Sequence, residues 1–301
     1  MAGPINVVPP LAVSDAMLLA TDVPEADYPA WAVGTTYALA ARVIVASEHS
    51  IYESAADGNV GNDPTTSPLW SVVGPTNRWA LFDRSNSTQT SQAVHMSYQL
   101  QPGLGVNAIA ALNVRGCNSV TVQLVHPSLG TVYDHTFQLA SLPLQAGWWE
   151  WFFGQRNAPR LMLAFDLPGI PGCTLQVDFH GTSELAVGVL LIGQATQIGF
   201  AVQAGAKVGI QDYSRKETDD FGNTDLVPRA FAKRASFNAL VATARVDELS
   251  DFLAELRATP ALWVGALSVG ATAIYGFYNQ FDITLDNTEF SQCSIDIEGL
   301  T

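Results

Sequence analysis

The stretch W-A-V-G-T-T-Y-A-L-A-A-R-V-I-V at residues 31–45, followed by H-S-I-Y-E-S at 49–54, sets the pattern on which the fold of this chain depends. It contains two short runs of β-prone residues, at 41–46 and 50–54, and polar punctuation lies on either side of them. Short β-prone runs separated by turn residues indicate antiparallel strands. The stretch therefore predicts a small β-meander.

Four aromatic residues mark this meander and the D-G-N-V-G-N-D-P loop that follows it: Trp31, Tyr37, Tyr52 and Trp70. A unit of about forty residues is marginally stable alone, so several of these rings are expected to form a miniature core. A ring left on the surface would suit the apolar face of a sugar. Two interpretations stay open, a glycan-binding platform and a structural spacer whose four rings are all core.

The spacing of six residues across this stretch resembles the small chitin-binding type of carbohydrate-binding module, which chitinases and many phage tail proteins carry. The six residues are Trp31, Tyr37, Val43, Tyr52, Pro64 and Trp70. The resemblance implies a module at 31–76 with Trp31, Tyr37, Tyr52 and Trp70 as candidate glycan-binding residues. The chain departs from the family at Ala40-Ala41, where the strand pair usually turns through Gly-Asp.

The composition excludes several classes of protein. The chain has 301 residues, of which 48% are hydrophobic and 14% charged. This predicts two or three domains with sizeable cores. The formal net charge of −14 disfavours nucleic acid and anionic membranes as partners. Because the first basic residue is Arg42 and apolar runs such as 185–192 are short, we expect synthesis in a cytoplasm without a secretion signal or membrane insertion.

Three widely spaced cysteines, Cys117, Cys173 and Cys293, show no C-x-x-C pattern and no His at ligand spacing. They are expected to be free buried thiols. The sequence therefore predicts no metal site, and it suggests no cofactor.

The first 30 residues contain five prolines, which prevent a long helix. An extended N-terminal arm is expected over 1–30, with the module at 31–76 and a domain boundary after the Gly74-Pro75 break. Residues 77–197 then show regularly spaced β-rich runs, at 96–100, 108–114, 120–125, 132–139, 160–165, 175–179 and 186–192. This spacing predicts a β-sandwich of the jelly-roll kind.

The cluster G-W-W-E-W-F-F at 147–153 places aromatic residues on both faces of one strand. Candidate interface residues here are Trp148, Trp149, Trp151 and Phe152. Burial between domains or subunits is one interpretation, and a second sugar platform is the other.

Residues 198–301 are expected to form a β-rich assembly domain with one helix at about 246–257. Apolar residues recur there at helical spacing, with acids early and Arg257 late, and Pro260 follows. The whole chain is therefore predicted to be mainly β: a β-meander module, a β-sandwich and a C-terminal domain with one amphipathic helix.

The order of motifs after residue 77 resembles tail proteins of long-tailed bacteriophages. These motifs are N-R-W-A-L-F-D, D-Y-S-R, F-G, R-A-F-A-K-R, the helix, P-A-L-W-V-G, Y-G-F-Y-N-Q-F-D-I and I-E-G-L. The resemblance implies a structural virion protein of a tail tip or baseplate, made in the host cytoplasm. It also implies assembly as a symmetric ring or trimer with other tail proteins, while the module would bind host-surface polysaccharide.

Catalytic signatures such as G-x-S-x-G, H-E-x-x-H and G-x-x-x-x-G-K-[ST] are absent from the sequence, and we expect no enzymatic activity. The alternative is a polysaccharide hydrolase, or depolymerase, because a glycosidase needs only two carboxylates. The nearest acidic cluster is Asp212, Glu217, Asp219 and Asp220, and a solvated loop is its simpler interpretation.

A loop with Asp57, Asn59, Asn62 and Asp63 faintly resembles a calcium loop but has Pro68 at the twelfth position.

Overall fold

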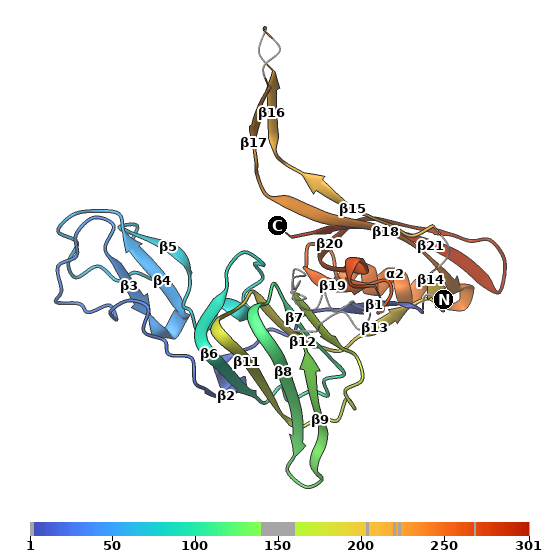
Figure 1. Ribbon diagram of the computed structural model, residues 1–301, viewed down its shortest axis with the longest axis horizontal. Coiled ribbons are helices and arrows are strands. Elements are labelled where there is room, and N and C mark those ends of the chain that lie inside the picture. The colour runs from blue at the N-terminus through green and yellow to red at the C-terminus, as the bar shows by residue number, and fades with distance from the viewer. Residues whose placement is uncertain are drawn as a thin grey trace, which may run out of the picture. The chain divides into compact units, whose positions relative to one another are not determined.

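The structure is a computed structural model that describes residues 3–139, 160–202, 205–218, 221, 224–267 and 269–300. The chain divides into two compact units, one of residues 12–191 and one of residues 1–11 together with 192–301. Both are built from antiparallel sheets, and α2 (Val246–Glu255) is the only α-helix within the described ranges (Figure 1). The expectation of a mainly β fold is confirmed.

The unit of residues 12–191 contains the small meander as a separate three-stranded sheet. Its strands are β3 (Arg42–Val45), β4 (Ser50–Ser54) and β5 (Trp70–Pro75), in the order β3-β4-β5. A 3-10 turn, η2 (Ala46–Glu48), joins the first two strands, and it ends at His49 in the left-handed conformation with φ 50°. The predicted meander is thus present, with an irregular rather than a two-residue turn.

Two further sheets in this unit form a β-sandwich-like body, as the sequence pattern predicts. The larger sheet has the order β2-β6-β11-β8-β9 and the smaller one β10-β7-β12. The larger sheet comprises β2 (Leu18–Thr21), β6 (Thr90–Leu100), β11 (Thr174–Val187), β8 (Arg115–His126) and β9 (Gly130–Gln138). The smaller sheet comprises β10 (Leu161–Ala164), β7 (Ala108–Leu112) and β12 (Val189–Gly193). Short 3-10 turns are η1 (Asp15–Met17) and η3 (Ala80–Phe82).

Alternation of side chains explains why the larger sheet is buried on one face. Met96, Tyr98 and Leu100 of β6 are fully buried, whereas the residues between them are polar. Valines and leucines of β8 and β11 repeat this pattern, because successive side chains of a strand point to opposite faces.

The second unit is organised around one eight-stranded sheet. Its order is β13-β1-β19-β20-β21-β18-β14, and β15 also pairs with β18. The strands are β1 (Ile5–Val8), β13 (Thr196–Ile198), β14 (Ala201–Val202), β15 (Lys207–Asp212), β18 (Phe231–Ala242), β19 (Ala261–Val264), β20 (Ala273–Thr284) and β21 (Phe290–Gly299). Two 3-10 turns, η4 (Thr243–Arg245) and η5 (Gly270–Thr272), complete the unit together with α2.

The sheet curls, because its two edge strands, β13 and β14, are joined by only Gly199 and Phe200. Gly199 has φ 72°, and a Cβ there would lie 2.6 Å from the Leu240 carbonyl oxygen, so this tight junction requires glycine. The curled sheet encloses a core that includes Phe237 and Trp263, and Leu249 and Leu253 of α2 pack into it. The expected amphipathic helix is therefore confirmed.

The first 30 residues do not form the single extended arm that their prolines suggested. β1 lies inside the sheet of the second unit, where it pairs with β13 and β19, and all four of its residues are buried. β2 is an edge strand of the larger sandwich sheet and pairs with β6. The prolines flank these strands without interrupting them, since they stand at 4, 9, 10, 24 and 29.

A two-stranded ribbon extends from the second unit's sheet. It consists of β16 (Arg215–Thr218) and β17 (Thr224–Val227), which pair with each other, and it stands away from the sheet between β15 and β18 (Figure 1). The sequence pattern indicated a charged loop here, and the structure differs by pairing residues 215–218 with residues 224–227 as two antiparallel strands.

Candidate functional site

Three of the four candidate glycan-binding rings lie in the core of the small sheet. Tyr37, Tyr52 and Trp70 are 9%, 7% and 6% exposed, and together with Val43 they form one hydrophobic cluster. Tyr37 and Trp70 meet edge to face, with ring centroids 5.1 Å apart. Trp31 packs against this cluster and is only partly buried.

The polar ends of Tyr37 and Trp70 bind the backbone. The Tyr37 hydroxyl oxygen accepts a hydrogen bond from the Ala32 amide at 2.8 Å, and Trp70 Nε1 donates to the Asn62 carbonyl oxygen at 3.1 Å. A ring can stack on a sugar only through an open face. Of the four candidates, Trp31 is therefore the ring that retains exposed surface for such a contact.

Asn59, Asn62 and Asp63 of the 57–63 loop form hydrogen bonds with nearby residues. Asn59 is buried and its side-chain amide donates to Ser54 Oγ at 3.0 Å, while Asn62 donates to Asn59 Oδ1 at 2.8 Å. Asp63 Oδ1 accepts from the amide and the hydroxyl of Thr65, and these two hydrogen bonds lower the pKa of Asp63. Across the described ranges, no cluster of three or more His, Cys, Asp or Glu side chains has the geometry of a metal site.

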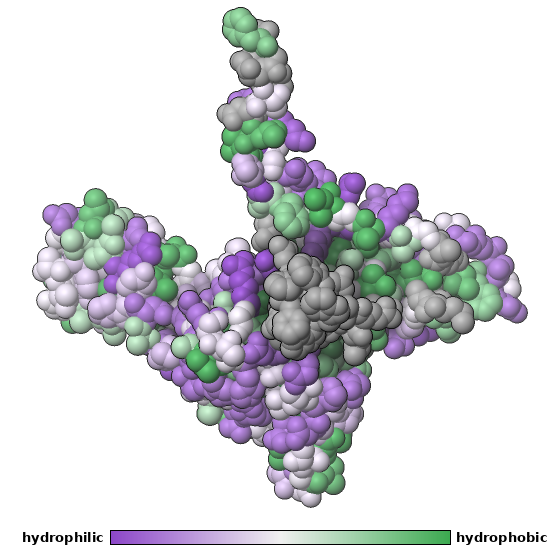
Figure 2. Space-filling model, in the orientation of Figure 1, coloured by the Kyte–Doolittle hydropathy of each residue, from purple (hydrophilic) through white to green (hydrophobic). Residues whose placement is uncertain are grey.

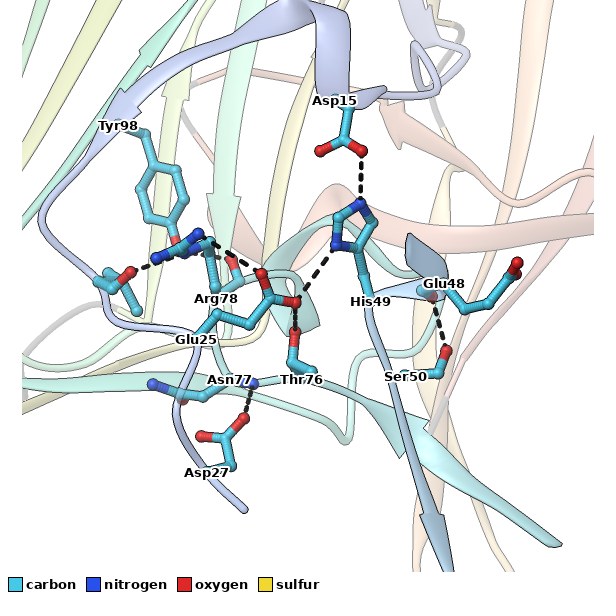
Figure 3. Close-up of polar contacts among 11 residues, drawn as sticks. Asp15, Glu25, Asp27, Glu48, His49, Ser50, Thr76, Asn77, Arg78 and Tyr98 are labelled. Carbon is cyan, nitrogen blue, oxygen red and sulfur yellow. Dashed lines mark hydrogen bonds and ion pairs between the residues drawn. The ribbon is translucent and has the colours of Figure 1, made fainter. Parts of the chain in front are cut away.

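Glu25 is the centre of a polar network that fixes the small sheet to the following linker (Figure 3). Its Oε1 accepts from the Thr76 hydroxyl at 2.8 Å and lies 3.2 Å from His49 Nδ1, and its Oε2 lies 3.4 Å from Arg78 Nη1. The other ring nitrogen of His49, Nε2, lies 3.1 Å from Asp15 Oδ2. The Glu25 side chain is only 11% exposed, so these contacts form in a partly desolvated site.

Aromatic stacking and backbone contacts reinforce this network. The ring of His49 stacks on Trp79, with centroids 4.0 Å apart and an interplanar angle of 21°. Arg78 Nε donates to the Val23 carbonyl oxygen at 2.8 Å, and the Asn77 amide donates to Asp27 Oδ2 at 2.8 Å. These contacts hold the segment that precedes the small sheet against the segment that follows it.

Sequence reasoning did not single out Glu25 or His49. Their contacts span 24 and 51 positions along the chain, and no motif spacing connects them. The left-handed backbone at His49 is a turn feature that composition alone does not reveal.

The described members of the predicted acidic cluster have local partners. Asp212 Oδ1 accepts from the Ser214 amide at 2.9 Å, and hydrogen bonds from Ser214 lower the pKa of Asp212. Glu217 forms an ion pair with Arg215 on the same strand. Asp219 and Asp220 lie outside the described residues.

The ribbon β16–β17 is exposed on both faces and carries apolar side chains. Leu226 is 60% exposed and Val227 44%, and Tyr213 and Phe231 at its base are also exposed. Figure 2 shows apolar surface on this ribbon, in green beside purple polar atoms. Exposed apolar side chains that gather on one projecting element make it a candidate interaction site.

A pocket of about 390 Å³ lies beside α2 in the same unit. Its apolar lining includes Val241, Leu249 and Phe252, and Glu248, Asp251 and Glu255 of α2 contribute carboxylates. Arg245 Nε and Nη2 bind both oxygens of Glu248, at 2.9 and 3.0 Å, and this contact lowers the pKa of Glu248. The pocket is therefore apolar with an acidic rim.

The candidate interface residues Trp148, Trp149, Trp151 and Phe152 lie outside the described residues.

Cys117, Cys173 and Cys293 are buried free thiols, as expected, and burial raises the pKa of each. No helix within the described part of the chain is long and apolar enough to cross a membrane.

Comparisons of the chain with protein-family models, with curated proteins and with solved structures each found no match.

Proposed function

We propose that this chain is a non-enzymatic structural protein of a phage tail tip or baseplate, which assembles with further copies of itself and with other tail proteins. The observation that carries the proposal is the projecting ribbon β16–β17, whose strand β17 exposes the apolar side chain of Leu226. The resemblance of the motif order to phage tail proteins adds the class of assembly.

The physical reason is the low stability of a lone hairpin. An isolated two-stranded ribbon is marginally stable in water, because neither face is covered. Leu226 and Phe231 add exposed apolar area, which a partner would remove from water. Assembly would therefore stabilise the ribbon, because a partner would cover its exposed apolar side chains.

The small sheet has a separate role in this proposal. It presents Trp31 to host-surface polysaccharide, and the Glu25 network holds it in a fixed orientation on the adjoining linker. Rigid attachment favours recognition, because a preorganised site loses less conformational entropy on binding.

Ribbon removal tests the assembly proposal. In a full-length variant, residues 215–227 are replaced by Gly-Asn-Gly, and circular dichroism checks that the fold is retained. We expect wild type to form a defined oligomer by sedimentation velocity and to be present in purified particles, and the variant to lose both properties. A wild-type protein that is absent from particles, or that releases reducing sugar from host polysaccharide, would overturn the proposal.

A further inference from the structure

We infer that the ribbon β16–β17 of one copy binds the acidic pocket beside α2 of a second copy, in a head-to-tail contact. This inference rests on the proposed function, because it names the partner that covers the ribbon. Four observations carry it: the chemistry of the pocket, the chemistry of one ribbon face, their positions within one unit, and the charge distribution of the chain.

The pocket offers an apolar floor and uncompensated negative charge. Val241, Leu249 and Phe252 line it, and its volume of about 390 Å³ suits a few inserted side chains. Arg245 already neutralises Glu248. Asp251 and Glu255 form no ion pair with any residue that the structure describes, and both are exposed. The pocket thus favours an apolar side chain accompanied by a cation.

One face of the ribbon has this combination. The strand register pairs Lys216 with Leu226 and Arg215 with Val227. Because paired residues point to the same face, Lys216 and Leu226 share one face, and Arg215 and Val227 share the other. Arg215 is neutralised by Glu217, whereas Lys216 forms no ion pair within the described part of the chain. Leu226 supplies the apolar group and Lys216 the cation.

The ribbon does not occupy the pocket of its own chain. None of the residues that line the pocket belongs to β16 or β17, although both features lie in one compact unit. The ribbon also stands away from the sheet that α2 packs against (Figure 1). A contact between two different surfaces is heterologous, and such contacts generate rings when the rotation closes.

The charge distribution makes this pairing selective. Two copies with a formal charge of −14 each repel one another over most of their surface. Six of the fourteen Lys and Arg residues nevertheless lie between 207 and 234, which includes the ribbon: Lys207, Arg215, Lys216, Arg229, Lys233 and Arg234. The acidic rim on α2 therefore meets the region of the chain where cations are most concentrated.

Mixing two defective variants tests the contact. Leu226→Asp removes the ribbon side of the contact, and Asp251→Lys with Glu255→Lys removes the pocket side. We expect each variant alone to be monomeric at tens of micromolar, with self-association weakened about tenfold or more. An equimolar mixture should form a 1:1 dimer and nothing larger, because only one intact ribbon and one intact pocket remain per pair. Sedimentation velocity measures these species.

Matched controls separate the two faces of each element. Val227→Asp introduces the same charge on the opposite ribbon face, and Asp247→Lys reverses an exposed acid of α2 outside the pocket. Both should assemble as wild type. The inference is overturned if the mixture stays monomeric, or if Val227→Asp disrupts assembly as strongly as Leu226→Asp. Should the mixture stay monomeric while ribbon removal still abolishes incorporation into particles, the proposed function stands and the ribbon binds another tail protein.

Discussion

Trp70 shows what a single ring contributes to the small sheet. It is 6% exposed, it meets Tyr37 edge to face, and its indole nitrogen binds the backbone of the 57–69 loop. We predict that Trp70→Ala destabilises the sheet by about 3–5 kcal/mol, the usual range for a buried Trp. Unfolding in urea, followed by hydrogen exchange of residues 42–75, measures this loss. Destabilisation of less than about 1 kcal/mol would show that the ring is not a core residue in solution.

Trp31 should behave in the opposite way, since it is only partly buried. We predict that Trp31→Ala leaves the fold intact but weakens binding of chitin oligomers or host envelope glycans by about tenfold, which corresponds to about 1.4 kcal/mol. Calorimetric titration of the full chain provides the measurement. If wild type shows no binding at millimolar sugar, the small sheet is a structural spacer.

Cys293 gives the protein a predicted sensitivity to alkaline pH. Burial, together with nearby Asp282, raises the pKa of this thiol from 9.0 to about 11. In the unfolded chain the thiol ionises near pH 9, so the unfolded state binds fewer protons than the native state above that pH. The associated stability is complete below pH 9 and is lost as the pH rises toward 11.

The loss should amount to about 2–3 kcal/mol, because one pKa unit corresponds to about 1.4 kcal/mol. We predict that Cys293→Ala flattens the fall in unfolding free energy between pH 8.5 and 10.5, whatever its effect at neutral pH. The other two thiols remain in both proteins and cancel in the comparison. Parallel pH profiles for wild type and variant would contradict the assignment.

Among the elements, the linker at 76–79 depends on Glu25. Replacing Glu25 by Ala leaves the Thr76 hydroxyl, His49 and Arg78 without their shared acceptor. Hydrogen bonds to charged groups contribute about 1.5–3 kcal/mol each in favourable cases. We predict faster hydrogen exchange at the amides of residues 76–78 and new protease cleavage near Pro75, with little change in the sandwich. Glu48→Ala is the matched control, because its exposed side chain lies on the same turn as His49.

Elements whose signals are local could be predicted from the sequence. The alternation in M-S-Y-Q-L identifies β6, and the apolar spacing between 246 and 256 identifies α2. β1 is different, since I-N-V-V is only four residues long and its partners, β13 and β19, lie near residues 198 and 263. Its place in a sheet depends on pairing across the whole chain, which no local pattern records.

The candidate site was predictable to the same limited extent. The sequence spacing correctly placed four aromatic rings in one small meander: Trp31, Tyr37, Tyr52 and Trp70. Which rings face inward depends on register, such as the pairing of Tyr52 with Val43, and on how the 57–69 loop folds back over Trp70. The two faces of the ribbon likewise become distinct only once its register is known.

For the molecule as a whole, we expect the N-terminal strand to determine whether the second unit folds. Ile5, Val7 and Val8 are fully buried between β13 and β19. Burial of three such side chains contributes roughly 5–9 kcal/mol, which is comparable with the 5–15 kcal/mol that stabilises a typical domain. We predict that deleting residues 1–11 abolishes hydrogen-exchange protection in 192–300 while 12–191 stays protected.

Removal of residues 1 and 2 alone is the control for this deletion, because it leaves β1 in place and should preserve protection in both units. An expendable extended arm would give a different result. In that case protection of 192–300 would survive the longer deletion.

The same strand has a consequence for synthesis on the ribosome. β1 is translated before the entire unit of residues 12–191, and its partners β13 and β19 are translated only afterwards. At roughly 5–20 residues per second, the nascent I-N-V-V segment waits about 10–40 s for the first of them. During that interval its apolar side chains and unpaired amides are accessible to chaperones and to the β1 segments of neighbouring nascent chains. The yield of correctly folded protein should therefore depend on translation speed through codons 12–264 and on chaperone supply in the producing cell.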